Sequence, residues 1–361
     1  MRTTQQTVPS ASMRRAHALE DALDRLRHHR FIDSSGMAMH GPMGAEALSA
    51  LGGDDAVPRW VDTYNRRYDA VGAPPAVARI DRRDPQSVAL ALGDAARLSD
   101  WLSYFRAELT ESSWDDVVRA WVPRLLPGYG GMFTHGLLRT AHSVRILETV
   151  PQLPEAVDEL AQGLALWAGT FRPLPGDPRL RGELALGRAI ERLPRPAAPW
   201  GLAEAALFQR IDELAGLPDA VDALQEPAEP SAALSDLTAT FAFMMLQHHD
   251  VHPYAFVHAI TPIAGGRVLD RFLGEDSARE RYRHHWHVDA AIAASFLPAV
   301  APATVEIGDV PDRAELAARA IEHADTHVVK FTEACLREHA LRPDPVYLAA
   351  AARLITSTPA W

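Results

Sequence analysis

Residues 14–30 read RRAHALEDALDRLRHHR, and their apolar side chains recur every three or four positions. Ala16, Leu19, Leu23 and Leu26 therefore fall on one stripe of a helix, while the histidines and arginines occupy a polar face. This spacing continues through most of the chain, and no run of alternating apolar and polar residues is long enough for a sheet. The pattern predicts an all-α fold, with helices over 14–30, 43–51, 56–71, 86–109, 112–126, 134–149, 154–170, 178–192, 202–215, 231–249, 253–273, 276–296, 312–340 and 344–356.

We expect a single large multi-helical domain over residues 1–361. Residues 1–13 are expected to be flexible, and the Pro-rich segment 172–230 to form a surface excursion between two helical halves. Histidines that could act together lie on both sides of this excursion. A site shared between them would make the two halves one domain.

The composition excludes several classes of protein. The chain has 361 residues, a net charge of −11 and 47% hydrophobic residues, which is typical of a globular protein. The acidic balance argues against nucleic acid as a partner, and no apolar run reaches the roughly 20 residues of a membrane helix. The single cysteine, Cys335, cannot form an internal disulfide, and no apolar signal segment follows Arg2, Arg14 and Arg15. We therefore expect a cytoplasmic protein that binds neither nucleic acid nor membranes.

Lys330 is the only lysine among 36 basic residues, and all the others are arginines. A drift of the whole sequence towards arginine explains the low number of lysines but not the one that remains. Arginine can replace lysine as a surface charge, but not where a neutral amine is required. This contrast makes Lys330 a candidate functional residue.

The helix expected over 312–340 carries His323, His327 and Lys330 at spacings that place them on one stripe, flanked by apolar residues. If that stripe faces inward, burial would depress the pKa of the Lys330 amine. The alternative is a lysine that snorkels to the surface along its own helix.

Three further segments carry histidines in suggestive positions. A glycine-rich loop leads into a helix on which His135, Arg139 and His142 share a face, although these histidines could simply bond to neighbouring groups in a core. His258 lies in an apolar run, where a buried imidazole needs a partner or a metal. His40 precedes a helix that begins with proline, a place where a structural role is the alternative.

Familiar catalytic motifs are absent from the sequence. The glycine loop lacks the GxGxxG spacing of dinucleotide sites, and no HExxH or GxSxG motif occurs. Cys335 lies off the His327 stripe, and no cysteine pair exists for structural zinc. Beyond possible metal ligands, the sequence therefore selects no catalytic residue.

Four separated blocks resemble the questin oxidase-like family. They are MHGPM at 39–43, HGLLR at 135–139, HP followed by VHAIT within 252–261, and DTHVVK at 325–330. Each block is short, but their order makes the match specific over roughly residues 30–340. The family includes fungal enzymes that oxidatively open anthraquinone rings in polyketide biosynthesis and were first described as Baeyer–Villiger-like. Some relatives are atypical non-haem iron dioxygenases whose metal is held by four histidines and a carboxylated lysine.

The resemblance implies a metal site buried between the helices. Its ligands in this chain would be the imidazoles of His40, His135, His258 and His327 and a CO2-derived carbamate on Lys330. The substitutes for these ligands are His142 and His323. It also implies iron as the metal, with zinc or another divalent ion as the alternative, and O2 as co-substrate. The implied activity is an oxygenase or dioxygenase acting on an aromatic polyketide or hydroxyquinone, with ring cleavage among its outcomes. A reductase could supply reduced substrate.

Two other functions remain open from the sequence. One is a metal-free, NADPH-linked Baeyer–Villiger-like oxidase, and the other is a helical binding protein with structural histidines. The content of tightly held metal separates the metal-dependent enzyme from both. Trp60, Tyr64, Phe133 and Trp286 could line an aromatic substrate pocket, and core positions are the alternative for all four.

Overall fold

The computed structural model describes residues 10–34, 36–151, 153–198, 200–248, 250–274, 277–299 and 304–361. These residues form helices joined by loops and three isolated β-bridges, with no strand among them, which confirms the predicted all-α fold. None of the described helices combines the length and hydropathy needed to cross a membrane. The α-helices are α1 Ala11–Leu26, α2 Gly41–Ala50, α3 Val57–Arg67, α4 Pro85–Ala91, α5 Leu98–Glu111, α6 Trp114–Leu125, α7 His135–Thr149, α8 Pro154–Gly169, α9 Leu186–Arg192, α10 Leu202–Ala206, α11 Leu217–Asp222, α12 Pro230–Gln247, α13 Tyr254–Gly266, α14 Ser277–Phe296, α15 Arg313–His323, α16 Thr326–Leu341 and α17 Pro345–Ser357.

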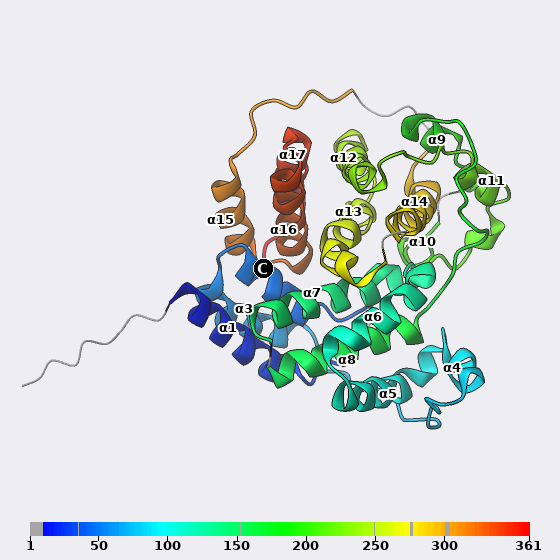
Figure 1. Ribbon diagram of the computed structural model, residues 1–361. Helices are drawn as coiled ribbons and strands as arrows, with labels where there is room; N and C mark the ends of the chain where they lie inside the picture. Colours follow the sequence, from blue (N-terminus) through cyan, green and yellow to red (C-terminus); the bar gives the residue numbers. More distant parts are fainter. Residues whose placement is uncertain are drawn as a thin grey trace, which may run out of the picture.

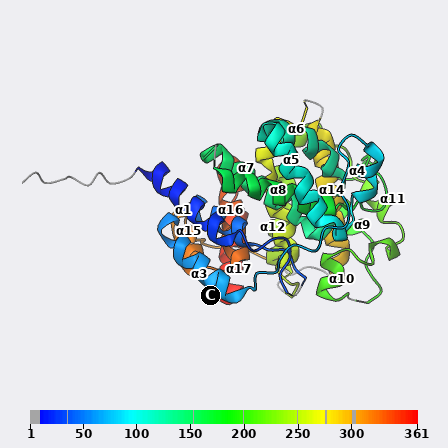
Figure 2. The same ribbon diagram turned by 90° about the horizontal axis from the view of Figure 1, so that it is seen from below.

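Helices α7 and α8 form the closest pair in the fold and run across the base of the group α12, α13, α16 and α17 (Figure 1). Two glycines permit this approach, because a Cβ on Gly136 would lie 2.4 Å from Trp167 Cα and one on Gly163 would lie 2.8 Å from the Thr140 nitrogen. Seen from below, the C-terminus lies next to α3 (Figure 2), and Trp361 stacks on Trp60 of α3 with ring centroids 5.9 Å apart. The first and last parts of the chain therefore meet on one side of α7.

The Pro-rich segment 172–230, expected to form a surface excursion, has exposed residues along its length but also contributes side chains to the core. Its residues Leu180, Phe208 and Val221 are buried in the same hydrophobic cluster as side chains of α1 and α17. Trp286 of α14 donates a hydrogen bond from Nε1 to the Val221 carbonyl at 3.0 Å. The sequence pattern did not predict the burial of these residues. In this turn-rich segment the apolar residues occur singly between prolines and glycines and do not form a helical stripe.

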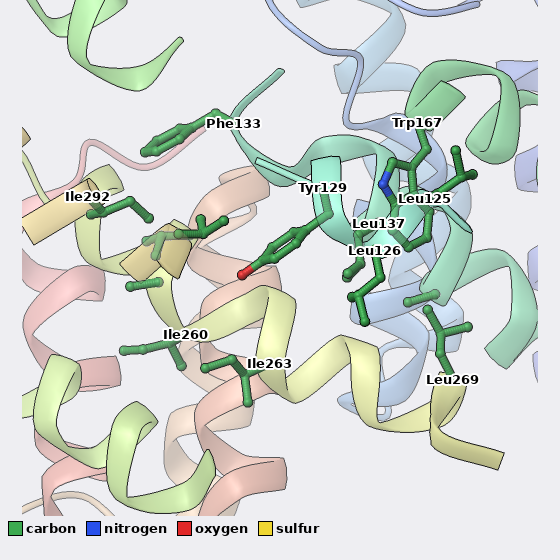
Figure 3. Packing of buried hydrophobic residues seen from close by; sticks show 14 of the residues in the cluster. Leu125, Leu126, Tyr129, Phe133, Leu137, Trp167, Ile260, Ile263, Leu269 and Ile292 are labelled. Carbon is green, nitrogen blue, oxygen red and sulfur yellow. The ribbon is translucent and has the colours of Figure 1, made fainter. Parts of the chain in front are cut away.

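The main hydrophobic cluster lies where the pair α7 and α8 meets the group α12, α13, α16 and α17. In Figure 3, Tyr129 lies between Leu126 of the short turn after α6 and Ile260 and Ile263 of α13. Tyr129 is 1% exposed, and its hydroxyl hydrogen-bonds with His285 Nδ1 at 2.8 Å, which satisfies the polar end of the ring. The segment that leads to His135 is thus anchored in the core immediately before α7 begins.

Three predicted helices are divided in the structure, and a fourth is shorter than predicted. The helix expected over 202–215 is reduced to α10 and a separate 3-10 turn at Ile211–Glu213, and the one expected over 178–192 begins only at Leu186. The helix expected over 86–109 is divided into α4 and α5 by Gly93, whose φ is +79° and whose N–H bonds to the Ala168 carbonyl at 2.8 Å. The helix expected over 312–340 is divided into α15 and α16 at Ala324, which has a left-handed φ of 65°. Residues 11–13 were expected to be flexible, but they belong to α1, which is capped by Ser10 Oγ; residues 1–9 lie outside the described part.

Gly136→Ala is expected to destabilise the protein by about 1–3 kcal/mol, since the added methyl would overlap Trp167 and push α7 away from α8. Gly187→Ala is the matched control. A Cβ on Gly187 in α9 meets nothing within 4 Å, so this variant should gain up to about 1 kcal/mol from reduced chain entropy. Chemical denaturation of both variants measures the difference. Equal stabilities would show that the α7–α8 approach can relax without cost.

Candidate functional site

Four histidines from four different parts of the chain meet at one place. His40 precedes the first residue of α2, His135 begins α7, His258 lies in α13, and His327 lies in the first turn of α16. Their ring centroids are 4.7 Å apart for His40–His135, 4.6 Å for His40–His327, 4.7 Å for His135–His258 and 6.0 Å for His258–His327. We call these residues the histidine cluster.

The imidazoles of the histidine cluster are held by groups outside it. His135 Nδ1 donates to the Met132 carbonyl at 2.7 Å, which leaves the lone pair of its Nε2 directed at His40 Nε2, 3.0 Å away. His258 Nδ1 is 3.3 Å from the Thr134 hydroxyl, and the His40 backbone N–H donates to the Tyr64 hydroxyl at 2.9 Å. Such outer contacts fix ring orientation and tautomer in metal sites.

An unusual backbone places His135. Met132, Phe133 and Thr134 have φ values of 46°, 50° and 69°, which are left-handed conformations that cost free energy for residues other than glycine. The preceding Gly131 has no alternative residue, because a Cβ there would lie 1.6 Å from the Thr170 carbonyl oxygen. The turn therefore depends on the contact with the end of α8, and it directs both Phe133 and His135 towards His258.

Lys330 lies one helical turn after His327 and completes the group. Its side chain is 2% exposed, and its Nζ atom has no hydrogen-bond partner among the described residues. Burial lowers the pKa of the amine to about 7, and the charge of Asp325 opposes only part of this shift. The snorkelling alternative is therefore wrong for Lys330.

Burial also lowers the pKa of every imidazole in the histidine cluster, and that of His135 falls to about 3. The charge that Lys330 would carry lowers each of these pKa values further. At neutral pH the four rings are therefore neutral, which is the form that binds metals.

The cluster has a buried side and a side nearer to solvent. His135 and His258 are each 2% exposed, whereas His40 and His327 are half-buried. Tyr254 stacks on His327 at 3.9 Å between ring centroids, and Phe133 lies 4.2 Å from His258. Exposure to solvent within the cluster is therefore greatest at the residues His40 and His327.

Of the four aromatics considered as pocket residues, all are buried, but only two touch the histidine cluster. Phe133 contacts His258, and Tyr64 bonds to the His40 backbone. Trp60 donates to the Ala324 carbonyl at 2.7 Å, and Trp286 packs against 172–230 at Val221. Tyr254 was missed by the sequence reasoning, although its place directly after His252 and Pro253 at the start of a histidine-bearing helix was a usable signal.

The two substitute ligands have other partners. His142 Nδ1 bonds to the buried Glu46 carboxylate at 2.7 Å, within an ion-pair network that includes Arg145 and Glu333. His323 ends α15, and its Nε2 bonds to the Thr358 carbonyl at 2.9 Å. The break at Ala324 removes His323 from the His327 stripe, so the expectation of a single stripe was wrong.

Arg139 is also not part of the histidine cluster. It forms a buried two-pronged ion pair with Glu159, with Nε–Oε1 and Nη2–Oε2 distances of 2.5 and 2.8 Å. The alternative of a core helix thus holds for Arg139 and His142, whereas His135 takes part in the cluster. Among the remaining histidines, His285 and His287 bond to Tyr129 and to the Pro175 carbonyl, and His249 lies outside the described residues.

In the part of the chain that the structure describes, no group of three or more His, Cys, Asp and Glu side chains has its donor atoms placed to hold a metal ion. The histidine cluster brings one pair of imidazole nitrogens, those of His40 and His135, within 3.0 Å. Compared with models of protein families and with curated proteins, the sequence matches none.

Proposed function

We propose that this chain is a metal-dependent oxygenase, with non-haem iron held by His40, His135, His258, His327 and a carbamate on Lys330. The observation that carries the proposal is the only lysine of the chain, which is buried beside four neutral imidazoles and has no hydrogen-bond partner among the residues that the structure describes. An orphaned buried amine costs free energy, and retention of lysine in a chain that otherwise uses arginine calls for a reason.

The donor set fits a divalent metal. Two imidazole nitrogens bound to one ion at about 2.0–2.1 Å and at a right angle lie about 3.0 Å apart, which is the His40–His135 separation. His258 and His327 are ring neighbours of these two, and rotation of their side chains would be needed to direct a third and a fourth nitrogen at the same ion. Phe133 and Tyr254 pack against these two rings, so such rotations would require both aromatic side chains to adjust.

Lys330 would supply the anionic ligand that the imidazoles lack. The lone pair of a neutral Nζ attacks the carbon of CO2, one C–O π bond becomes the carbamate C–O⁻, and the proton lost from nitrogen leaves to solvent. With a pKa of about 7, half or more of the amine is neutral above pH 7, so no base is needed to deprotonate an ammonium group before the attack. The carbamate oxygen then takes the place of the carboxylate in sites built from histidines and one carboxylate.

When bound, iron supplies the one-electron chemistry with O2 that protein side chains lack. The chain's own residues position the reaction: Tyr254 and Phe133 cover the rings of His327 and His258 and limit access of water. Half-buried His40 and His327 mark the side from which an aromatic polyketide or hydroxyquinone would approach. The proposed reaction is O2-dependent oxidation of that substrate, with ring cleavage among its outcomes and a reductase as a source of reduced substrate.

Metal analysis of protein purified without a histidine tag tests the proposal. We expect about one iron per chain, and O2 consumption with a reduced hydroxyquinone that depends on that iron. One tightly held zinc per chain would keep the ligand set but refute the oxygenase. Absence of any bound metal after reconstitution with Fe(II) and bicarbonate would refute both, and would favour the metal-free oxidase or the binding protein.

A further inference from the structure

A cavity lies outside the histidine cluster. This groove of about 600 Å³ lies between α9 with the segment that follows it, the C-terminal half of α12, and residues 297–299 after α14. Its walls are mainly apolar and include Ile190, Leu193, Phe243, Met244 and Leu297. The volume falls within the range of pockets that bind small molecules.

One cation in this groove has no counter-charge. Arg195 lines the groove, is half-buried, and makes no ion pair among the described residues. Its guanidinium donates only to main-chain carbonyls, those of Ile190, Leu193 and Pro194, at 3.1–3.3 Å. The carboxylate of Glu191, which also lines the groove, is paired with Arg188. The uncompensated charge of the groove is therefore positive.

We infer that this groove binds an apolar small molecule that carries one anionic oxygen group, a carboxylate or a phenolate, with the anion on Arg195. The apolar walls bury the body of such a ligand, and Arg195 still has donors in a fixed, planar arrangement suited to an oxyanion. The charge of Arg195 disfavours cationic ligands. The mainly apolar walls disfavour a polar sugar or a nucleotide, because such ligands need many hydrogen-bonding partners.

The groove adjoins the histidine cluster through two rings. Leu297 follows Phe296, whose ring centroid lies 6.0 Å from that of Phe133, and Phe133 lies 4.2 Å from His258. The idea that the groove ligand is also the substrate of the enzyme rests on the proposed function. Binding of a ligand in the groove is independent of that function, because no residue of the histidine cluster lines the groove.

Isothermal titration of the 361-residue chain, freed of metal by a chelator, tests the inference. The probes are 2-naphthoate as an aromatic acid, decanoate as an alkyl acid, and 2-naphthylmethanol as a neutral analogue. We expect one saturable site for at least one acid, at least tenfold tighter than for the alcohol, since the alcohol can still accept a hydrogen bond from Arg195 but lacks the negative charge that strengthens it. The acid that binds more tightly identifies the source class of the ligand.

Two variants and a control locate the site. Arg195→Gln should weaken binding of the acid about tenfold or more, while the same substitution at the exposed Arg192, which does not line the groove, should leave binding unchanged. Gly187→Trp should abolish binding by filling the groove, because a side chain at Gly187 starts in open space and need not disturb the fold.

Absence of saturable binding for both acids would overturn the inference, and so would binding that Gly187→Trp leaves unaffected. Because the protein is metal-free throughout, failure here leaves the metal proposal intact, and failure of the metal proposal leaves this result intact.

Discussion

Lys330→Arg is expected to lower metal affinity by about 100-fold or more and to abolish iron-dependent O2 consumption. A guanidinium stays protonated at any working pH and cannot form a carbamate. It would also place a fixed cation where a divalent metal ion is proposed to bind, in a buried site in which like charges repel strongly. Iron per chain, measured after reconstitution with bicarbonate, gives the result. An arginine variant with normal metal content would end the carbamate proposal.

Lys330→Met is the control that separates metal binding from folding, because arginine in a buried position could also unfold the chain. Methionine fills a similar volume without an amine, so the metal-free variant should be more stable than the wild type by about 1–3 kcal/mol, the cost of an unsatisfied buried group. It should nevertheless bind no iron. Lys330→Glu restores an anionic oxygen with a shorter reach and should recover part of the affinity.

The same pair of proteins gives a dependence on pH with a definite sign. The pKa of Lys330 falls from its usual 10.5 to about 7 on folding, so between these values the unfolded chain binds more protons than the folded one. The unfolding free energy of metal-free wild type should therefore rise with pH, by at most about 1.4 kcal/mol per unit, relative to Lys330→Met. Denaturation of both proteins from pH 7 to 9 in CO2-free buffer measures it. A constant difference would mean that Lys330 is not desolvated.

Removing any one ring of the histidine cluster should have an effect of similar size. His135→Ala, His258→Ala and His327→Ala are each expected to lose at least 10- to 100-fold in metal affinity, since each takes away a ligand or the group that orients one. His323→Ala is the matched control, because that ring bonds to the Thr358 carbonyl and lies outside the cluster. Metal content and thermal unfolding are measured on the same preparations. If all three variants keep full occupancy, the metal site lies elsewhere.

The helical class was predictable because it depends on a local property, the recurrence of apolar side chains at three and four residues. The break between α15 and α16 was not, because the periodicity continues through it. Asp325 caps α16 by accepting bonds from the N–H groups of His327 and Val328, and Trp60 holds the Ala324 carbonyl from a helix more than 250 residues earlier. That second contact is a tertiary one, which no local pattern contains.

The histidine cluster was predictable only in part. Resemblance of four blocks pointed to His40, His135, His258, His327 and Lys330, and the structure brings these residues together. Spacing alone favoured His142 and His323 equally, since both share a helical register with true members. Their exclusion follows from partners distant in sequence, Glu46 and Thr358, that only the fold reveals.

The placement of the four rings at residues 40, 135, 258 and 327 has a consequence for assembly. An ion bound there would act as a cross-link between segments drawn from nearly the whole length of the chain, and such a link narrows the unfolded ensemble most when the loops it closes are long. Contacts between residues so far apart in the sequence form late, because the chain loses the entropy of closing a long loop before it gains the energy of the contact. The left-handed turn before His135 packs Gly131 closely against the Thr170 carbonyl at the end of α8. Metal binding would therefore be the final step of folding, and only chains in which all four histidine-bearing segments have reached their folded positions would bind the ion.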